Sequence, residues 1–303
     1  MNSPINPIQF VTSIKKLASE AAESLAPSSP AYKEALGRII RPVDYMRCAE
    51  FVLAFEQVSL EPSMRVLDIG SPQWFSLHLA HSYPKTQFYY VNILDRELDQ
   101  TREIAECLDI DNISYHKQDV RSLEFDSHYF DKAISISVLE HVAPDIGGDI
   151  LALNEIRRVL ISRGELIFSV PLKTAPNRVY QDGAVYERGE KEHNFFAREY
   201  DLEQFQNLVR DTGFLIKEKS FIIEQPGLFA LDYWLWGPGK NMGYNYLMMK
   251  LIKVIERILR ASVEDKLAAL YLKSSPEVQY RVVNVVATIK KLEHGVESSV
   301  VNR

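Results

Sequence analysis

The sequence has little of what marks a secreted, membrane-spanning or nucleic-acid-binding protein. It holds only two cysteines in 303 residues, Cys48 and Cys107, and we expect both to be reduced packing residues. No apolar run approaches the ~20 residues that a spanning helix needs, and the N-terminus has neither a charged nor an apolar leader segment. The formal net charge of −6 predicts no general basic surface for nucleic acid. We therefore expect a cytoplasmic protein with no nucleic-acid partner.

Clusters of metal ligands are lacking as well. His78 and His81 are three residues apart on an expected helix, but no further ligand follows nearby, so no metal site is expected. The composition that remains, 46% hydrophobic and 25% charged residues, is that of a globular chain. It is sufficient for one sizeable core and an additional helical region.

The clearest local signal is a strand followed by a tight turn and a helix. The apolar run 66–69 lies between turn residues and predicts a buried strand. Gly70 suits the turn, Ser71 can cap the next helix, and Pro72 suits its first turn. One carboxylate, Asp68, precedes the turn. A strand, a glycine turn and a helix N-terminus together form a geometry typical of nucleotide sites.

Strand and helix signals alternate beyond residue 64. The pattern predicts an α/β fold with a doubly wound, mostly parallel Rossmann-like sheet, N-terminal helices and a C-terminal helical appendage. The expected domains are an N-terminal helical cap (1–62), a core (63–224) and a C-terminal helical region (225–303). Strands are expected at 65–69, 87–93, 113–117, 130–137, 164–171 and 214–223. Helices are expected at 8–26, 73–83, 96–109, 146–160, 201–211, 244–261 and 276–293, and a helical region interrupted at Pro42 is expected at 31–59.

Polar side chains follow the second and third strands, where ligands bind in such a sheet. Asn92 stands where a ribose acceptor is expected, and Asp95 is the alternative, although it can equally cap a helix. Asp119 can accept a hydrogen bond from a purine amine. Ile93 and Val120 can sandwich the purine ring.

The order of these motifs resembles the class I S-adenosylmethionine-dependent methyltransferases, in particular their small-molecule branch. The resemblance implies that Asp68 and Gly70 hold the amino-acid end of the cofactor, Asn92 its ribose and Asp119 its adenine. Ser71 and Pro72 of the same turn are further candidate cofactor-binding residues. It also implies that 135–141, which includes Ser137, lines the floor near the methyl group. The matching segments are 66–70, the strand end at Asn92, 108–119, 130–142, 154–160, 164–171, 198–205 and 211–214.

The glycine turn departs from the family pattern. Such loops commonly carry three glycines, whereas here Gly70 is followed by Ser71, Pro72 and Gln73. Side chains add bulk where a ligand approaches, and proline has no N–H to donate. We expect cofactor binding to be retained through Gly70 and neighbouring side chains, because Asp68 and Asp119 are also present.

Two histidines are the candidate catalytic residues. His141 has a suitable intrinsic pKa for a general base, but in this family a histidine at that place often has a structural role. His193 and Tyr186 lie in the polar segment 172–200, which is placed to cover an acceptor. The aromatic stretch Leu228–Trp236 and the helices after it are expected to complete a substrate pocket or a dimer interface. The basic face of helix 244–261 permits membrane-surface contact as a less favoured alternative.

The sequence therefore predicts a methyltransferase that uses S-adenosylmethionine and acts on a small-molecule acceptor. A degenerate methyltransferase fold that serves as a binding or scaffold protein is one alternative. An NADPH-dependent reductase is another, because neutral Asn92 would not repel a 2′-phosphate and Arg96 could pair with it. The identity of the acceptor is not readable from these motifs.

Overall fold

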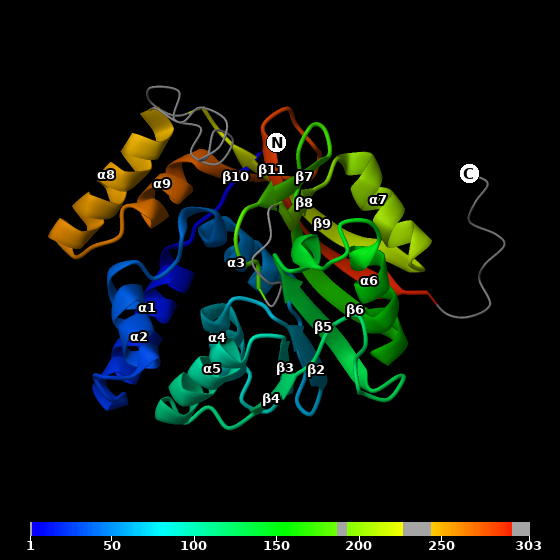
Figure 1. Ribbon diagram of the computed structural model, residues 1–303, viewed down its shortest axis with the longest axis horizontal. Helices are drawn as coiled ribbons and strands as arrows, with labels where there is room; N and C mark the ends of the chain where they lie inside the picture. Colours follow the sequence, from blue (N-terminus) through cyan, green and yellow to red (C-terminus); the bar gives the residue numbers. More distant parts are fainter. Residues whose placement is uncertain (1, 187–192, 227–243, 293–303) are drawn as a thin grey trace.

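The computed structural model describes residues 2–186, 193–226 and 244–292. A nine-stranded sheet forms the centre of the molecule, and helices cover both of its faces (Figure 1). The parallel part of the sheet has the order β6-β5-β2-β3-β4. Its strands are β2 (Arg65–Ile69), β3 (Gln87–Asn92), β4 (Ile113–Lys117), β5 (Phe130–Ile136) and β6 (Leu160–Pro171).

This strand order creates a crevice at one edge of the sheet. The chain runs from β2 outward to β3 and β4, then returns to add β5 and β6 on the other side of β2. The order therefore reverses between β2 and β5, and ligands bind beyond the carboxyl ends of the strands at such a point. Within the sheet, Asp68 pairs with Tyr90 of β3 and with Ile134 of β5.

The predicted helix at 276–293 is wrong, because the chain forms strand β11 (Val282–Lys291) there. β11 lies antiparallel between β6 and β9 (Phe214–Glu224). A strand that is buried on both faces has no polar alternation, so its apolar positions can imitate a helical period. The C-terminal region thus adds strands to the central sheet: β11, and β10 (Leu272–Ser275), which pairs with β9 and with the short β1 (Ser3–Pro4).

The helices pack in two layers. One layer contains α1 to α5 and shares a core with Val66, Phe88 and Val286 of the sheet. The other contains α6 and α7 and packs on Leu67 and Phe168 of the opposite face. The helices are α1 (Ile8–Ser24), α2 (Pro30–Ile40), α3 (Tyr45–Gln57), α4 (Gln73–Ser82), α5 (Asp95–Cys107), α6 (Gly148–Val159) and α7 (Leu202–Asp211).

The expected helix cap at the first turn is also wrong. Helix α4 begins at Gln73 with Pro72 at its N-cap and no capping side chain. The Ser71 hydroxyl instead accepts a hydrogen bond from the Ile136 backbone N–H at 3.1 Å. Ser71 therefore joins the turn to β5, which is a tertiary role that local sequence cannot reveal.

The remaining segments lie around the carboxyl edge of the sheet. After β6 the chain forms a hairpin of β7 (Asn177–Gln181) and β8 (Asn194–Glu199) in place of an irregular loop. Helices α8 (Tyr244–Leu259) and α9 (Glu264–Tyr271) follow β9, whereas Leu228–Trp236 lies outside the described residues. No described helix is both long and apolar enough to cross a bilayer.

Candidate functional site

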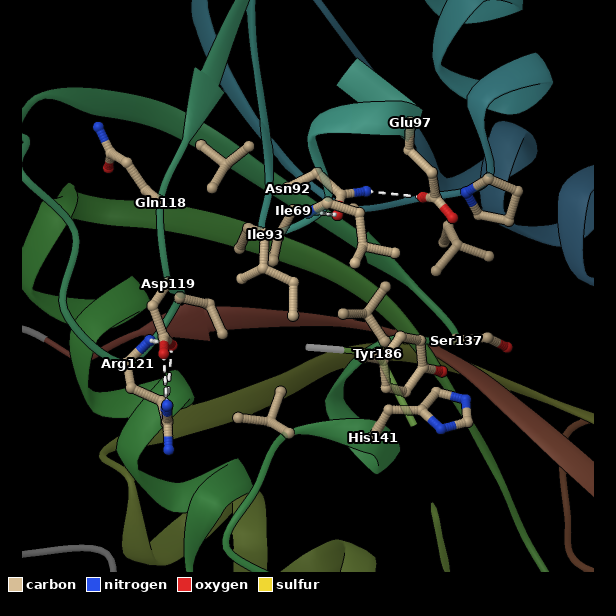
Figure 2. Close-up of a pocket in the computed structure, with 18 of the residues that line it drawn as sticks. Ile69, Asn92, Ile93, Glu97, Gln118, Asp119, Arg121, Ser137, His141 and Tyr186 are labelled. Carbon is tan, nitrogen blue, oxygen red and sulfur yellow. Dashed lines mark hydrogen bonds and ion pairs between the residues drawn. The ribbon is translucent and has the colours of Figure 1, made fainter. Parts of the chain in front are cut away.

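A cavity of about 460 Å³ opens at the carboxyl ends of the parallel strands. Figure 2 shows Asp119 and Arg121 on one side of it and Ser137, His141 and Tyr186 on the other. No cluster of three or more metal-ligating side chains occurs in the described part of the chain. The cavity is lined by Arg47, Ile69, Gly70, Pro72, Val91, Asn92, Ile93, Leu94, Glu97, Gln118, Asp119, Val120, Arg121, Ile136, Ser137, Val138, His141, Val142, Ala143 and Tyr186.

The glycine turn forms one wall of the cavity. Gly70 has a φ of 56°, in the left-handed region where other residues are disfavoured. Its backbone N–H donates to the Val91 carbonyl at 2.8 Å, so the turn is tied to the end of β3. Pro72 lines the cavity, while Ser71 is fully buried behind the turn.

Asp68 is also fully buried and does not line the cavity. One of its oxygens, Oδ1, accepts from the Ser71 backbone N–H at 3.2 Å. The other, Oδ2, has no hydrogen-bond partner among the described residues. Burial raises the pKa of Asp68 to about 6, since a charged carboxylate is poorly solvated there. Asp68 therefore supports the turn from behind.

Beside the end of β3 lies a carboxylate from the first turn of α5, Glu97, that the sequence analysis missed. Asn92 Nδ2 donates to Glu97 Oε2 at 2.8 Å, and both residues line the cavity (Figure 2). Asn92 Oδ1 accepts from the Leu94 N–H at 3.0 Å, which fixes the amide. Asp95, the alternative ribose ligand, instead pairs with Lys117 at 2.7 Å and is not part of the cavity.

The same carboxylate bears on the reductase alternative. Arg96, the expected partner of a 2′-phosphate, does not line the cavity, whereas Glu97 does. A carboxylate repels a phosphate and accepts hydrogen bonds from hydroxyls. The site is therefore suited to an unphosphorylated ribose. Helical spacing within the first turn of α5 was the only signal in the sequence that could have identified Glu97.

Asp119 lies at the end of β4 in a bidentate pair with Arg121. Arg121 Nε is 2.9 and 3.0 Å from the two carboxylate oxygens, and this hydrogen bonding lowers the pKa of Asp119. Arg121 also donates to the Ala143 carbonyl at 2.9 Å. Ile93 and Val120 line the same end of the cavity, so the expected apolar flank and acceptor are brought together.

On the opposite side, Ser137 is held by a buried network. Its φ is 51°, and its hydroxyl donates to Glu50 Oε1 of α3 at 2.6 Å. Ser169 and Asn284 donate to the same oxygen at 2.9 and 2.8 Å. Arg47, which lines the cavity, donates to Glu50 Oε2 at 2.5 Å. Helix α3, β5, β6 and β11 thus meet at one carboxylate.

His141 ends a short 3₁₀ turn, Leu139–His141, beside Ser137 and Tyr186 (Figure 2). Its Nδ1 is 2.7 Å from the Phe196 carbonyl oxygen. A carbonyl can only accept, so Nδ1 carries the proton and the neutral ring keeps a lone pair on Nε2. Tyr186 packs edge-on against the ring with centroids 5.5 Å apart.

Glu140 lies beneath this histidine, with Oε1 3.7 Å from His141 Nε2. Its side chain is buried, and Oε2 has no hydrogen-bond partner among the described residues. Burial raises the pKa of Glu140 to about 8, and the nearby charge of Glu50 adds to the effect. At neutral pH the carboxyl is therefore mainly protonated.

The structure does not bring His193 to the cavity. Its side chain is 83% exposed and lies 3.7 Å from Asp182 at the end of the β7–β8 hairpin, and it is not a lining residue. The expectation of a catalytic His193 is therefore not supported by its position. Tyr186, from the same segment, does line the cavity.

Comparisons with known proteins agree with this geometry. A sequence model described as a methyltransferase domain matches residues 60–213, which include every cavity residue except Arg47. The chain is 15% identical to the [4+2]-cyclase SpnF, with a TM-score of 0.50 over 96% of this chain and 98% of that one. It is 14% identical to the MccD protein, with a TM-score of 0.50 over 82% and 99%.

A methyltransferase from Methanosarcina mazei that depends on S-adenosylmethionine is 16% identical, with a TM-score of 0.48 over 77% of this chain and 94% of that one. At such identities structural likeness shows the fold alone. No curated protein sequence matches the chain. The family model, by contrast, covers slightly more than half of the chain and the whole parallel part of the sheet, β2 to β6. The chain thus belongs to the methyltransferase-domain family of class I S-adenosylmethionine-dependent methyltransferases, and its cofactor is S-adenosylmethionine.

Proposed function

We propose that the chain transfers a methyl group from S-adenosylmethionine to a small-molecule acceptor held beside His141 and Tyr186. The observation that carries this proposal is the composition of one cavity. It joins the residues that the family pattern assigns to the cofactor, Gly70, Asn92 and Asp119, to a wall that contains a histidine and a tyrosine.

The donor and acceptor groups fit the cofactor along the cavity. Glu97 can accept a hydrogen bond from one ribose hydroxyl, and the Asn92 amide can donate one to the other. Asp119 can accept from the adenine amine while Arg121 keeps it ionised, and Ile93 and Val120 can flank the ring. The left-handed turn at Gly70 leaves room for the amino-acid end, and Arg47, which donates to Glu50, lines the same cavity.

When bound, the cofactor supplies an electrophilic methyl carbon on a sulfonium that is already a good leaving group. The protein therefore has to align the acceptor and, where the acceptor carries a proton, remove it. His141 is arranged for the second task, because the bond to the Phe196 carbonyl fixes its tautomer and leaves Nε2 as the basic atom. Tyr186 limits the rotation of the ring by packing against it.

The size of the cavity favours a small acceptor. One space of about 460 Å³ has to hold the cofactor and the acceptor together, and ligand pockets span roughly 300–1,000 Å³. We place the activity in the cytoplasm, since the two unpaired cysteines suit a reducing compartment.

The experiment combines calorimetry with labelled transfer. S-adenosylhomocysteine should bind the full chain, and methyl-labelled cofactor should label the low-mass fraction of a metabolite extract. Label that appears only in the macromolecular fraction would overturn the small-molecule acceptor. Binding without any transfer would favour the scaffold alternative, and absence of binding would refute the proposal.

A further inference from the structure

Helix α8 presents an unusual outward face. Leu251, Val254 and Ile258 are 47%, 52% and 73% exposed, and their spacing of three and four residues places them on one stripe of the helix. Such side chains are normally turned toward a core. Ile252 is the buried apolar residue of the same helix segment, at 7% exposure, so the exposed stripe is additional to the face that packs on the protein.

A basic stripe runs along α8 beside the apolar one. Its members are exposed. At roughly 100° per residue they lie on the outward face of the helix, directly next to the apolar stripe. They continue one residue past the end of the helix. The basic stripe consists of Lys250, Lys253, Arg257 and Arg260.

The one acidic residue within this segment is turned inward. Glu256 is 3% exposed, and its Oε1 accepts from the N–H groups of Val263 and Glu264 at 2.8 and 3.0 Å, at the start of α9. Glu264 in turn accepts from the Tyr45 N–H of α3 at 2.6 Å. Helix α8 is thus anchored to the body of the protein, while over the described side chains, 250–260, its outward face carries apolar and cationic groups.

We propose that α8 docks on an anionic lipid surface, with the apolar stripe inserted at the head-group boundary and the basic stripe against lipid phosphates. Adjacent apolar and cationic stripes are the features by which interfacial helices bind membranes. Figure 1 shows α8 at the outer edge of the molecule with α9 beside it, so it can lie flat on a surface without rearrangement of the sheet.

A second copy of the chain fits this face less well. Stable protein interfaces involve ~20–30 residues on each side, whereas this apolar stripe offers three side chains beside four cations. The overall net charge of −6 means that the cations of α8 stand out from an otherwise acidic protein, so this helix is the part suited to an anionic surface. A lipid surface needs only a narrow stripe, and a fluid head-group region adapts to its shape.

The test is co-sedimentation of the full chain with vesicles of phosphatidylcholine alone and of phosphatidylcholine mixed with phosphatidylserine. Binding is expected only to the mixed vesicles and should weaken as salt is raised. The double variant Lys253→Glu, Arg257→Glu should lower the partition coefficient at least about tenfold. The double variant Val254→Ser, Ile258→Ser should also lower it, because the inserted area is lost.

Matched controls lie on α1. Ile8 is 64% exposed and the Lys16 side chain is 74% exposed, so Ile8→Ser and Lys16→Glu test exposed residues of the same kinds away from α8. These variants should bind as the parent does, and thermal melting should confirm that all of them fold. Equal binding to both vesicle types, or no binding to either, would overturn the proposal. A dimer that is lost in Val254→Ser, Ile258→Ser without vesicle binding would assign the stripe to self-association instead.

Discussion

At the residue scale, two side chains, Asn92 at the end of β3 and Glu97 of α5, together offer the hydrogen-bonding groups for a ribose that a single carboxylate usually provides. Asn92 is fixed through Leu94 and reaches Glu97 at 2.8 Å. An amide held in this way can donate to one hydroxyl while the carboxylate accepts from another. The pair explains how a neutral residue at the strand end is compatible with ribose binding.

We expect Glu97→Ala to weaken S-adenosylhomocysteine binding by about tenfold or more, because hydrogen bonds to a charged group contribute roughly 1.5–3 kcal/mol. Calorimetry measures the change. Asp95→Ala is the matched control in the same helical turn, since Asp95 pairs with Lys117 outside the cavity. Unchanged affinity in Glu97→Ala would assign the ribose to Asn92 alone.

His141 allows binding and chemistry to be separated. We expect His141→Gln to lower kcat by ~10²–10⁴-fold, the usual contribution of a general base, with little change in affinity for S-adenosylhomocysteine. His193→Gln, at an 83% exposed side chain, should leave both unchanged. A parallel loss of cofactor affinity in His141→Gln would indicate that this histidine organises the loop.

Glu140 predicts a dependence of stability on pH. Its pKa is raised from 4.5 to about 8 by burial, so between these values the folded state binds the proton that the unfolded state releases. Its contribution to the free energy of unfolding therefore falls as pH rises from about 4.5 to 8 and is constant above that range.

Replacement with glutamine should remove this dependence. Glu140→Gln should gain stability relative to the parent as pH rises through the same range, with an upper bound of roughly 5 kcal/mol. Urea unfolding at several pH values measures the difference. A constant difference between variant and parent across this range would contradict the expected protonation.

At the scale of elements, β11 shows how a buried strand escapes pattern analysis. Its buried positions on both faces are mostly valine, alanine and isoleucine but also include Asn284 and Thr288, so neither polar alternation nor a helical stripe is distinctive. Enrichment in β-branched residues was the usable signal. The segment becomes a strand because it fills the space between β6 and β9 and pairs with the facing edge of each.

A substitution at Ile289 tests how much β11 contributes to the free energy of unfolding. It is fully buried and pairs with Leu166 of β6 and Ile216 of β9. We expect Ile289→Ala to lower the free energy of unfolding by ~2–5 kcal/mol, measured by urea denaturation. Leu215→Ala, at a neighbouring position that is 50% exposed, should cost much less. Similar costs at both positions would mean that β11 contributes little to the core.

At the scale of the whole molecule, Glu50 joins the N-terminal helices, the sheet and the C-terminal strand. It is fully buried and accepts from Ser137, Ser169, Asn284 and Arg47. These partners come from regions that are far apart in the sequence. The left-handed backbone at Ser137, on the cavity wall, depends on the same carboxylate.

Removal of this carboxylate should therefore affect both stability and binding. We expect Glu50→Ala to lower the free energy of unfolding by ~3–5 kcal/mol, because it leaves a cation and three donors without their acceptor. Thermal melting and calorimetry with S-adenosylhomocysteine measure the two effects. Glu56→Ala, at an exposed position of the same helix, should lie within about 0.5 kcal/mol of the parent. Normal stability in Glu50→Ala would refute the joining role.

The sequence by itself determined the alternating strands and helices at 65–171 and 201–224, since local apolar runs and turn residues suffice to define them, whereas the β7–β8 hairpin between these ranges was not predicted. Ordered motifs also located Gly70, Asn92, Asp119 and His141 near one edge of the sheet, because parallel strands end on the same side. Only the tertiary structure decided that Glu97 joins Asn92, that Glu50 supports Ser137 and that 282–291 is a central strand. The last two depend on distances between segments remote in sequence, which are set by packing that no local pattern encodes, and the first depends on how the turn after β3 directs the start of α5.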